Sequence, residues 1–407
     1  MPVWPQPDAN LIERVTQLHQ ASYDATVPAV ATAPATWSFL GEHTDQVGGI
    51  VINSTAALRV AVAASPRTDD TIMVTTHELD SDGESVTFTD SVTLAEVAQH
   101  QQSKNLQVGG PEVRLGGVVW SMINRQYLSR DTKGFNITVV SEIPTRVGLG
   151  DEVAAEVAFA SILAESADHK LDAPLRARLA DLCATSAQYF SAVPSFRARY
   201  TAALRGSEDQ FNIVDYADGS VTHAPLLRDA DAYESFLVAL PQLTDNATDM
   251  ATRESFVREA SDAFGVDYLR RLPDATQRVT QWLAAMHQDQ PDTAQPGLEE
   301  AHRWLTFFEQ ETERAARASM LLRARKATEA LELVCASQRE LENLYGIVPE
   351  QERHLANLCL ARGATAARSA AAGLVQGVVV HCSAAKALNL MADLSEDGFT
   401  VVALSGC

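Results

Sequence analysis

The sequence lacks the features that mark disulfide-rich, zinc-binding, secreted and membrane proteins. Its five cysteines stand far apart, at residues 183, 335, 359, 382 and 407, and none forms a CxxC pair. The odd number and wide spacing argue against a disulfide framework and against a zinc site. No run reaches the roughly 18 apolar residues that span a bilayer, and the start, MPVWPQPDAN, has neither the basic nor the apolar region of a secretory signal. We therefore expect a cytoplasmic protein with reduced thiols and no membrane partner.

Positive charge is also scarce. The chain has 32 Lys and Arg against 53 Asp and Glu, which gives a net charge of −21. Such a surface repels phosphate backbones and anionic lipid, so we expect no nucleic-acid partner. The one basic run, residues 314–326, follows Glu309, Glu311 and Glu313 on a predicted helix and indicates a solvated, salt-bridged face. The histidines have no ligand spacing, so we expect no metal site from them.

The composition is that of an ordinary globular protein, with 46% hydrophobic and 21% charged residues in 407. This length suggests two domains. Strand-rich and helix-rich segments are mixed rather than alternating, which predicts an α+β fold. Polar residues 96–107 suggest a loop, and the Ala-rich residues 364–372 suggest helix packing. A polar break that ends at Asp172 and Pro174 leads us to expect domains over residues 1–180 and 181–407.

An acidic turn follows a predicted strand over residues 36–40. Its sequence, GEHTD, places Glu42, His43 and Asp45 within four residues. Short polar side chains on a turn can present several hydrogen-bond acceptors to vicinal hydroxyls, which is what sugar recognition requires. The alternative is a solvated turn whose aspartate caps its own backbone.

A second candidate segment is IPTRVGLGDE, residues 143–152. A strand over 135–141, a glycine turn and an Ala-rich helix follow one another here, and this geometry offers backbone N–H groups and a positive dipole end to a phosphate. The first helical turn, however, carries Asp151 and Glu152. They suit a helix N-terminus and can simply cap it, but two like charges about 4 Å apart repel by about 4 kcal/mol at an effective dielectric of 20. Only a bridging divalent cation would reverse the repulsion of a triphosphate.

Taken together, GEHTD after a strand and P-x-x-x-G-L-G before an Ala-rich helix resemble galactokinase of the GHMP small-molecule kinase family. The resemblance continues through Phe190, Pro194, Gly206 and Asp215 to the C-terminal strand, helix and strand. It implies a two-domain α+β fold with mixed sheets flanked by helices and an active-site cleft between the domains. It also implies transfer of the ATP γ-phosphate to the anomeric hydroxyl of galactose, with ATP and Mg²⁺ bound.

Part of the family's site is retained. The resemblance assigns Glu42, His43 and Asp45 to the sugar hydroxyls. In the phosphate loop, the family's serines, one of which helps to hold Mg²⁺, are replaced here. The phosphate loop of this chain consists of Pro144, Gly148, Leu149, Gly150, Asp151 and Glu152.

Other family positions are substituted. The catalytic arginine of the family corresponds to Thr36, and its catalytic aspartate corresponds to Arg199. A sugar-contacting glycine corresponds to Phe196, and a sugar-contacting tyrosine falls near Met250. The last glycine motif falls on residues 366–376 and has lost most of its glycines, and with them the close backbone approach that only glycine permits.

These substitutions predict a protein that is catalytically silent or strongly impaired. Arg199 cannot accept a proton and Thr36 carries no charge, and each such loss lowers a rate by roughly 10² to 10⁴. We expect a sugar-binding or regulatory pseudokinase. Three alternatives remain open: Arg199 anchors an anion such as a sugar phosphate or acid, it is an ordinary salt-bridged surface residue, or the chain is an active galactokinase that uses ATP and Mg²⁺ with replacement groups.

Overall fold

The computed structural model describes residues 4–23, 27–80, 84–102, 109–191, 196–228, 232–240, 247–289, 295–371 and 377–404. The chain divides into two compact units that are not consecutive in sequence. We call Ser38–Ser54 with the described residues after Gly206 the C-unit, and the described residues before Ser38 with Thr55–Gly206 the N-unit. Strands β1, Ala29–Leu40, and β2, Ile50–Pro66, contribute residues to both units.

The sheet of the N-unit is mixed. Its strands follow the order β4 (Ser85–Thr93), β3 (Thr71–Leu79), β5 (Phe135–Ser141) and β2, with β1 also paired to β2. Strands β3 and β5 run parallel, whereas β3 with β4 and β2 with β5 run antiparallel. Helix α1, Leu11–Tyr23, buries Leu11 and Val15 against Ala61, Ala63 and Val140 of this sheet.

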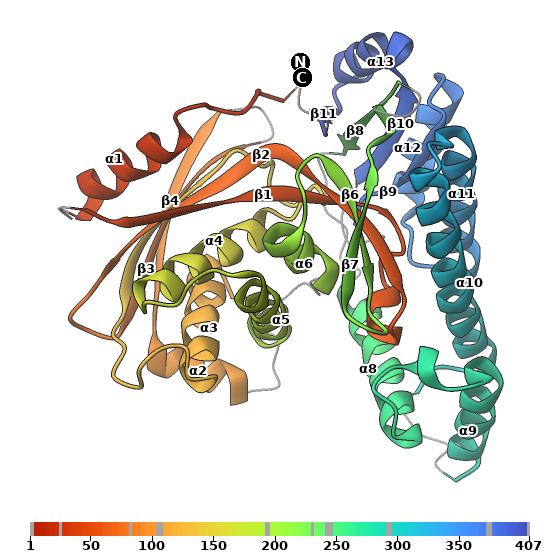
Figure 1. The fold of residues 1–407 in the computed structure, drawn as a ribbon, viewed down its shortest axis with the longest axis horizontal. Coiled ribbons are helices and arrows are strands. Elements are labelled where there is room, and N and C mark those ends of the chain that lie inside the picture. Colours follow the sequence, from red (N-terminus) through yellow and green to blue (C-terminus); the bar gives the residue numbers. More distant parts are fainter. Residues whose placement is uncertain are drawn as a thin grey trace. The chain divides into compact units, whose positions relative to one another are not determined.

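The remaining helices of the N-unit lie on the side of the sheet opposite α1 (Figure 1). Helices α3 and α5 approach closely, because a Cβ added at Gly117 would lie 2.3 Å from the Phe190 ring. Glycine is therefore required at this crossing. The helices are α2 (Leu94–Gln102), α3 (Pro111–Asn124), α4 (Asp151–Ser166), α5 (Ala173–Phe190) and α6 (Arg197–Arg205). Helix α5 contains residue 180, where the sequence suggested a domain boundary.

Helix α2 corrects one expectation. Residues 96–107 were expected to form a loop, but the chain is helical over Leu94–Gln102, and residues 103–107 lie outside the described part. A capping box starts the helix: the Thr93 N–H donates to the Glu96 carboxylate (2.8 Å), and the Glu96 N–H donates to the Thr93 hydroxyl (3.2 Å). These reciprocal bonds satisfy two backbone donors that the polar composition alone does not reveal.

The C-unit contains an antiparallel sheet and a hairpin. The sheet has the order β11 (Thr400–Ala403), β8 (Tyr233–Ala239), β10 (Gly377–Ser383) and β9 (Ala366–Ser369). The hairpin joins β6, Gln210–Asp215, to β7, Ser220–Pro225, and β6 pairs with the start of β2, with Ile50 opposite Asp215. The register places the β6 end beside the turn between β1 and β2.

Helices make up most of the C-unit (Figure 1). One expectation is wrong here and another holds only in part. The Ala-rich residues 366–369 form strand β9 rather than a helix. Arg314 and the preceding Glu311 are buried, whereas the other basic residues of the run, Arg317, Arg323, Arg325 and Lys326, are exposed as expected. The helices are α8 (Ala247–Phe264), α9 (Ala275–Asp289), α10 (Leu298–Arg323), α11 (Ala327–Glu340), α12 (Glu350–Ala361) and α13 (Ala384–Glu396), with short turns η1 (Thr44–Val47), η2 (Leu269–Arg271) and η3 (Leu341–Tyr345).

The expected α+β fold with mixed sheets and flanking helices is confirmed. Three positions used for the family resemblance or the thiol argument, Pro194, residues 372–376 and Cys407, lie outside the described residues. Cys183, Cys359 and Cys382 are buried, unpaired thiols. Within the described ranges, no helix combines the length and the apolar character that crossing a bilayer requires.

Candidate functional site

The GEHTD segment forms a tight turn at the end of β1, which we call the motif turn, Gly41–Asp45. Gly41 has φ +84°, and a Cβ there would lie 2.0 Å from the Ile50 carbonyl oxygen. The turn closes because the Thr44 N–H (3.0 Å) and the Thr44 hydroxyl (2.7 Å) both donate to the Gly41 carbonyl. Glycine at position 41 is thus a geometric requirement, and the turn is a built element rather than a loose loop.

The three polar side chains of the motif turn are buried in the C-unit. Glu42, His43 and Asp45 are 1%, 0% and 5% exposed. His43 has φ +79°, a left-handed conformation that non-glycine residues adopt rarely and mostly where surrounding structure enforces it. Its ring lies 4.8 Å from the Tyr345 ring of η3. The solvated-turn alternative for this segment is therefore wrong, since these side chains are packed in place.

Glu254 of α8 joins the acidic group of the motif turn. Gln46 links the two elements, since its backbone N–H donates to Asp45 Oδ1 (3.1 Å) and its side-chain amide donates to Glu254 Oε1 (3.0 Å). Burial, together with the negative charge of Asp45, raises the pKa of Glu254 to about 7. A carboxyl group that is partly protonated at neutral pH can donate as well as accept a hydrogen bond.

The sequence did not identify Glu254. It placed the family's sugar-contacting tyrosine near Met250, on the same helix. The structure buries Met250 completely, with its sulfur 3.9 Å from the Tyr345 hydroxyl. A polar residue one helical turn after an aligned position was the signal available in the sequence, because residues i and i+4 share a helix face.

The segment that the resemblance assigns to a phosphate loop lies in the N-unit, and we call its residues 143–150 the glycine turn. Pro144, Gly148 and Leu149 are buried, and Gly148 (φ +92°) and Gly150 (φ +68°) adopt left-handed conformations. The Thr36 N–H of β1 donates to the Leu149 carbonyl (2.8 Å). A Cβ at Gly150 would lie 2.6 Å from the Thr36 hydroxyl oxygen. The glycine turn is consequently packed directly on β1.

Arg199 stabilises the packing of the glycine turn on β1. Its Nη1 donates to the carbonyl oxygens of Thr36 and Gly148, both at 2.6 Å, and the side chain is 3% exposed. The guanidinium carbon lies 5.7 Å from the centre of the Phe196 ring, which is also buried. The structure therefore brings Thr36, Gly148 and Arg199 together. Arg199 is no solvated surface residue, and it satisfies main-chain carbonyls.

Asp151 occupies the N-terminus of α4. Gly150 at the N-cap supplies no side-chain cap, and the acidic side chains of Asp151 and Glu152 lie in the first turn of the helix. Burial, followed by the charge of Glu152, raises the pKa of Asp151 to about 7. Negatively charged side chains thus stand at the helix N-terminus, the place at which a phosphate would bind.

Glu152 takes part in a buried ion network. Arg114 of α3 pairs with Glu152 and donates from Nε to Glu156 Oε1 (2.7 Å). Arg114 Nη1 also donates to the Ser191 hydroxyl (3.0 Å), and the Tyr200 hydroxyl donates to the second oxygen of Glu156. The positive charge nearest the first turn of α4 is therefore already neutralised by two glutamates from the same helix.

These residues do not fit a nucleotide with its metal ion. The first turn of α4 places Asp151 and Glu152 where a triphosphate would need positive charge or N–H donors, and Arg199 faces carbonyl oxygens. We therefore derive no chemical step through ATP or Mg²⁺ for this chain.

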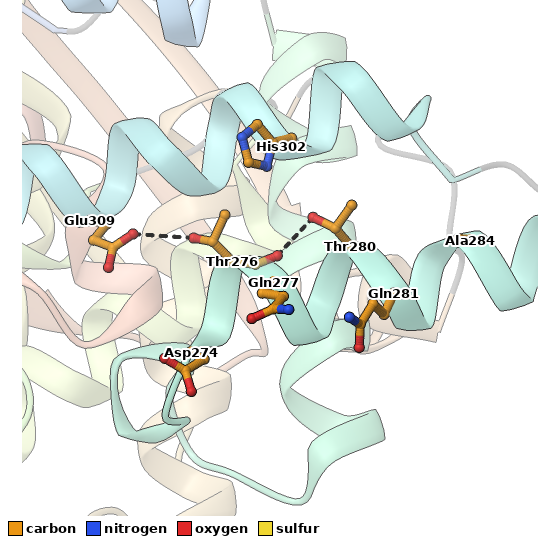
Figure 2. Close-up of a pocket in the computed structure, with 8 residues that line it drawn as sticks. All are labelled: Asp274, Thr276, Gln277, Thr280, Gln281, Ala284, His302 and Glu309. Atoms are coloured by element: carbon orange, nitrogen blue, oxygen red, sulfur yellow. Dashed lines mark hydrogen bonds between the residues drawn. The ribbon is translucent and has the colours of Figure 1, made fainter.

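A separate open pocket lies on helices α9 and α10 of the C-unit (Figure 2). All but one of the residues that line it carry a polar group, although most of the surface they expose to the pocket is apolar, and the Thr276 hydroxyl donates to Glu309 Oε2 (3.3 Å). His302 of α10 also lines it. None of the residues that line the pocket belongs to the motif turn.

Comparison with known proteins shows that the sequence is similar to galactokinases. Residues 17–66 match the galactokinase galactose-binding signature. The chain is 25% identical to dog galactokinase over 216 residues, 53% of this chain and 52% of the dog protein. It is 25% identical to human galactokinase over 267 residues, 65% of this chain and 64% of the human protein. The matched region thus spans about half to two thirds of these curated relatives.

Solved structures establish the class of fold. The Lactococcus lactis galactokinase complexed with galactose superposes with a TM-score of 0.74 at 18% identity, covering 97% of this chain and 98% of that one. The Methanococcus jannaschii mevalonate kinase superposes with a TM-score of 0.56 at 12% identity, covering 93% and 98%. The fold is that of the GHMP kinases. Within that class, the galactose-binding signature and the curated matches confirm the resemblance to galactokinases.

Proposed function

We propose that this chain is a sugar-binding pseudokinase: it recognises a galactose-type sugar through the motif turn and does not transfer phosphate to it. The sugar half of the proposal rests on the galactose-binding signature over residues 17–66 and on Glu42, His43 and Asp45 within it. A galactokinase of the same fold is known in complex with galactose. The ligand class is therefore a small sugar, or a sugar phosphate if an anion is tolerated.

The proposed loss of catalysis rests mainly on one observation. Arg199, at the position where the resemblance expects a catalytic aspartate, donates Nη1 to the carbonyl oxygens of Thr36 and Gly148. An arginine is permanently protonated and cannot accept the proton of a sugar hydroxyl. Its guanidinium group hydrogen-bonds to the backbone of β1 and of the glycine turn rather than to a transferred phosphate group.

The acidic start of α4 supports the same proposal. Asp151 and Glu152 lie in the first turn of α4, and Glu152 pairs with Arg114. A nucleotide whose phosphates bound at this helix start would have to approach both carboxylates. At about 4 Å and an effective dielectric of 20, each such repulsion is worth about 4 kcal/mol, which lowers affinity by roughly three orders of magnitude.

Titration calorimetry tests both halves at once. Galactose, galactose 1-phosphate and Mg-ATP are titrated separately into the full chain at pH 7.5. We expect saturable heat with galactose and none with Mg-ATP at millimolar concentration. Absence of heat with both sugars contradicts the sugar half, and saturable heat with Mg-ATP contradicts the pseudokinase half and favours an active galactokinase.

A matched pair of variants tests whether the heat of galactose binding comes from binding at the motif turn. Asp45→Asn removes a buried carboxylate charge of the motif turn, whereas Asp90→Asn makes the same change on the exposed strand β4. We expect Asp45→Asn to weaken galactose binding at least tenfold and Asp90→Asn to leave it unchanged. Equal affinities for the two variants would place the sugar elsewhere.

A further inference from the structure

A fully buried glutamate of helix α10 holds the motif turn at its first residue. Glu311 is 0% exposed, and its Oε1 accepts the Gly41 N–H at 3.0 Å. The same oxygen accepts the Ser337 hydroxyl of α11 at 2.7 Å. Glu311 is 270 residues from Gly41 in sequence, so this contact joins the sugar-binding segment to the helical end of the C-unit.

Two buried arginines neutralise Glu311. Arg314 pairs with its second oxygen, and Arg368 of β9 places Nη2 3.5 Å from Oε1 while Nε donates to the Ser337 hydroxyl at 2.9 Å. Glu340 pairs with the other edge of Arg314. Two carboxylates thus balance two guanidinium groups, with hydrogen bonds filling the remaining positions, which is the condition under which buried charges are tolerated.

The contact fixes the direction in which the motif turn leaves β1. Gly41 has φ +84°, and its carbonyl is already held by Thr44, so its N–H is the other hydrogen-bonding group of that residue. When both groups are bonded, the peptide planes on either side of Gly41 cannot rotate. The orientation of the next two residues, Glu42 and the left-handed His43, follows from those planes.

We propose that Glu311 is the positioning residue of the sugar-binding turn: through the Gly41 N–H it sets the orientation in which Glu42 and His43 meet the sugar hydroxyls. The proposal rests on the proposed sugar binding. It adds a residue of α10 to that function, and it makes the buried pairs with Arg314 and Arg368 part of sugar recognition as well as of stability. A one-ångström error in such placement is enough to weaken recognition.

The chain offers a matched pair of substitutions. Glu311→Gln keeps the shape of the side chain but removes its negative charge and replaces one acceptor oxygen with an NH₂ donor, which then faces either Arg314 or the Gly41 and Ser337 donors. Glu340→Gln removes a charge from the same Arg314 without touching the motif turn. We expect Glu311→Gln to weaken galactose binding at least tenfold by calorimetry, and Glu340→Gln to change it less than twofold, at temperatures where both variants are folded by circular dichroism.

A second readout is independent of sugar. Amide hydrogen exchange resolved at Gly41 should be at least ten times faster in Glu311→Gln than in the unmodified chain and unchanged in Glu340→Gln. If Glu311→Gln does not fold, Ser337→Ala provides the milder test, since it keeps both charges and removes one hydroxyl; it should speed Gly41 exchange about threefold.

The outcomes separate the two proposals. Galactose affinity and Gly41 exchange that are both unaltered in Glu311→Gln overturn the positioning role. Equal losses in Glu311→Gln and Glu340→Gln also overturn it, because they indicate general destabilisation. If the unmodified chain binds no galactose, the proposed function fails, and the effect of Glu311 on the motif turn is then decided by Gly41 exchange alone.

Discussion

Arg199 Nη1 donates a 2.6 Å hydrogen bond to the carbonyl oxygen of Thr36. These are the two positions at which the galactokinase resemblance expects a catalytic aspartate and a catalytic arginine. The arginine therefore stands at the family's aspartate position rather than at its arginine position, and its guanidinium group hydrogen-bonds to the backbone. A residue in this position stabilises the N-unit but has no lone pair with which to accept a proton.

The first prediction concerns the stability that Arg199 provides. Arg199→Ala leaves two buried carbonyl oxygens without this donor, so the free energy of unfolding in urea should fall by about 2 to 4 kcal/mol. Arg197→Ala on the same helix is the control, because the Arg197 side chain is 37% exposed and pairs with Asp181 at the surface, and it should cost less than about 1 kcal/mol. Similar losses for both variants would mean that the Arg199 contacts contribute no more than a surface pair.

The second prediction concerns anion binding at the start of α4. Asp151→Ser combined with Glu152→Ser removes two negative charges from the start of α4 and leaves Arg114 less neutralised. Affinity for inorganic phosphate, measured by calorimetry at low salt, should rise at least tenfold, about 1.4 kcal/mol, and the gain should shrink as salt is added.

Charge alone does not explain that expected gain. Glu165→Ser with Asp168→Ser makes the same change in net charge at the other end of the helix and should leave phosphate affinity unchanged. An equal gain in this control would show that overall charge, rather than the glycine turn, governs the anion.

The third prediction is a pH dependence set by Glu254. Folding raises the pKa of Glu254 from 4.5 to about 7, through burial and the charge of Asp45. A raised carboxyl pKa contributes stability that is fully present below pH 4.5 and is lost as the pH rises through 7. Glu254→Gln should therefore be more stable than the unmodified chain by about 3 kcal/mol at pH 8.5 and equal to it near pH 4.

Denaturant unfolding at these two pH values measures this difference. Asp262→Asn, an exposed change on the same helix, should show no such pH-dependent gain. A Glu254→Gln variant whose advantage is independent of pH would contradict the assignment of the titration to Glu254.

The fourth prediction isolates the crowding at Gly41. Gly41→Ala places a Cβ 2.0 Å from the Ile50 carbonyl oxygen, whereas Gly219→Ala, at a similar positive φ, meets nothing within 4 Å. The Gly219 variant should lose about 1 kcal/mol from backbone strain, and the Gly41 variant should lose over about 3 kcal/mol. Thermal unfolding checks both, and comparable melting temperatures would show that the motif turn can relax.

The sequence alone predicted the two turns of the candidate site. The motif turn and the glycine turn each follow a strand, and both were predicted because glycines and polar residues mark such turns. Strand β9 was missed because Ala366 and Ala367 favour helices locally, whereas pairing with β10 decides their conformation. Tertiary context overrode propensity at that point.

Long-range charge partners could not be predicted. Arg314 and Glu311 looked like a solvated pair on one helix, and only folding shows that Gly41 and Arg368 lie beside Glu311. The role of Arg199 was left open for the same reason, since its acceptors come from β1 and the glycine turn. Charged residues in a helix are buried only when distant partners satisfy them.

Phosphoryl transfer from γ-labelled Mg-ATP to galactose is the most direct test of this account. The full chain is incubated with both substrates beside an active galactokinase, and labelled sugar phosphate is separated and counted. Because Arg199 cannot accept a proton and Asp151 and Glu152 repel the triphosphate, we expect no labelled product above that of a reaction without protein. Product formed at an ordinary kinase rate, of the order of 1 per second or faster, and lost in Asp45→Asn would contradict the account.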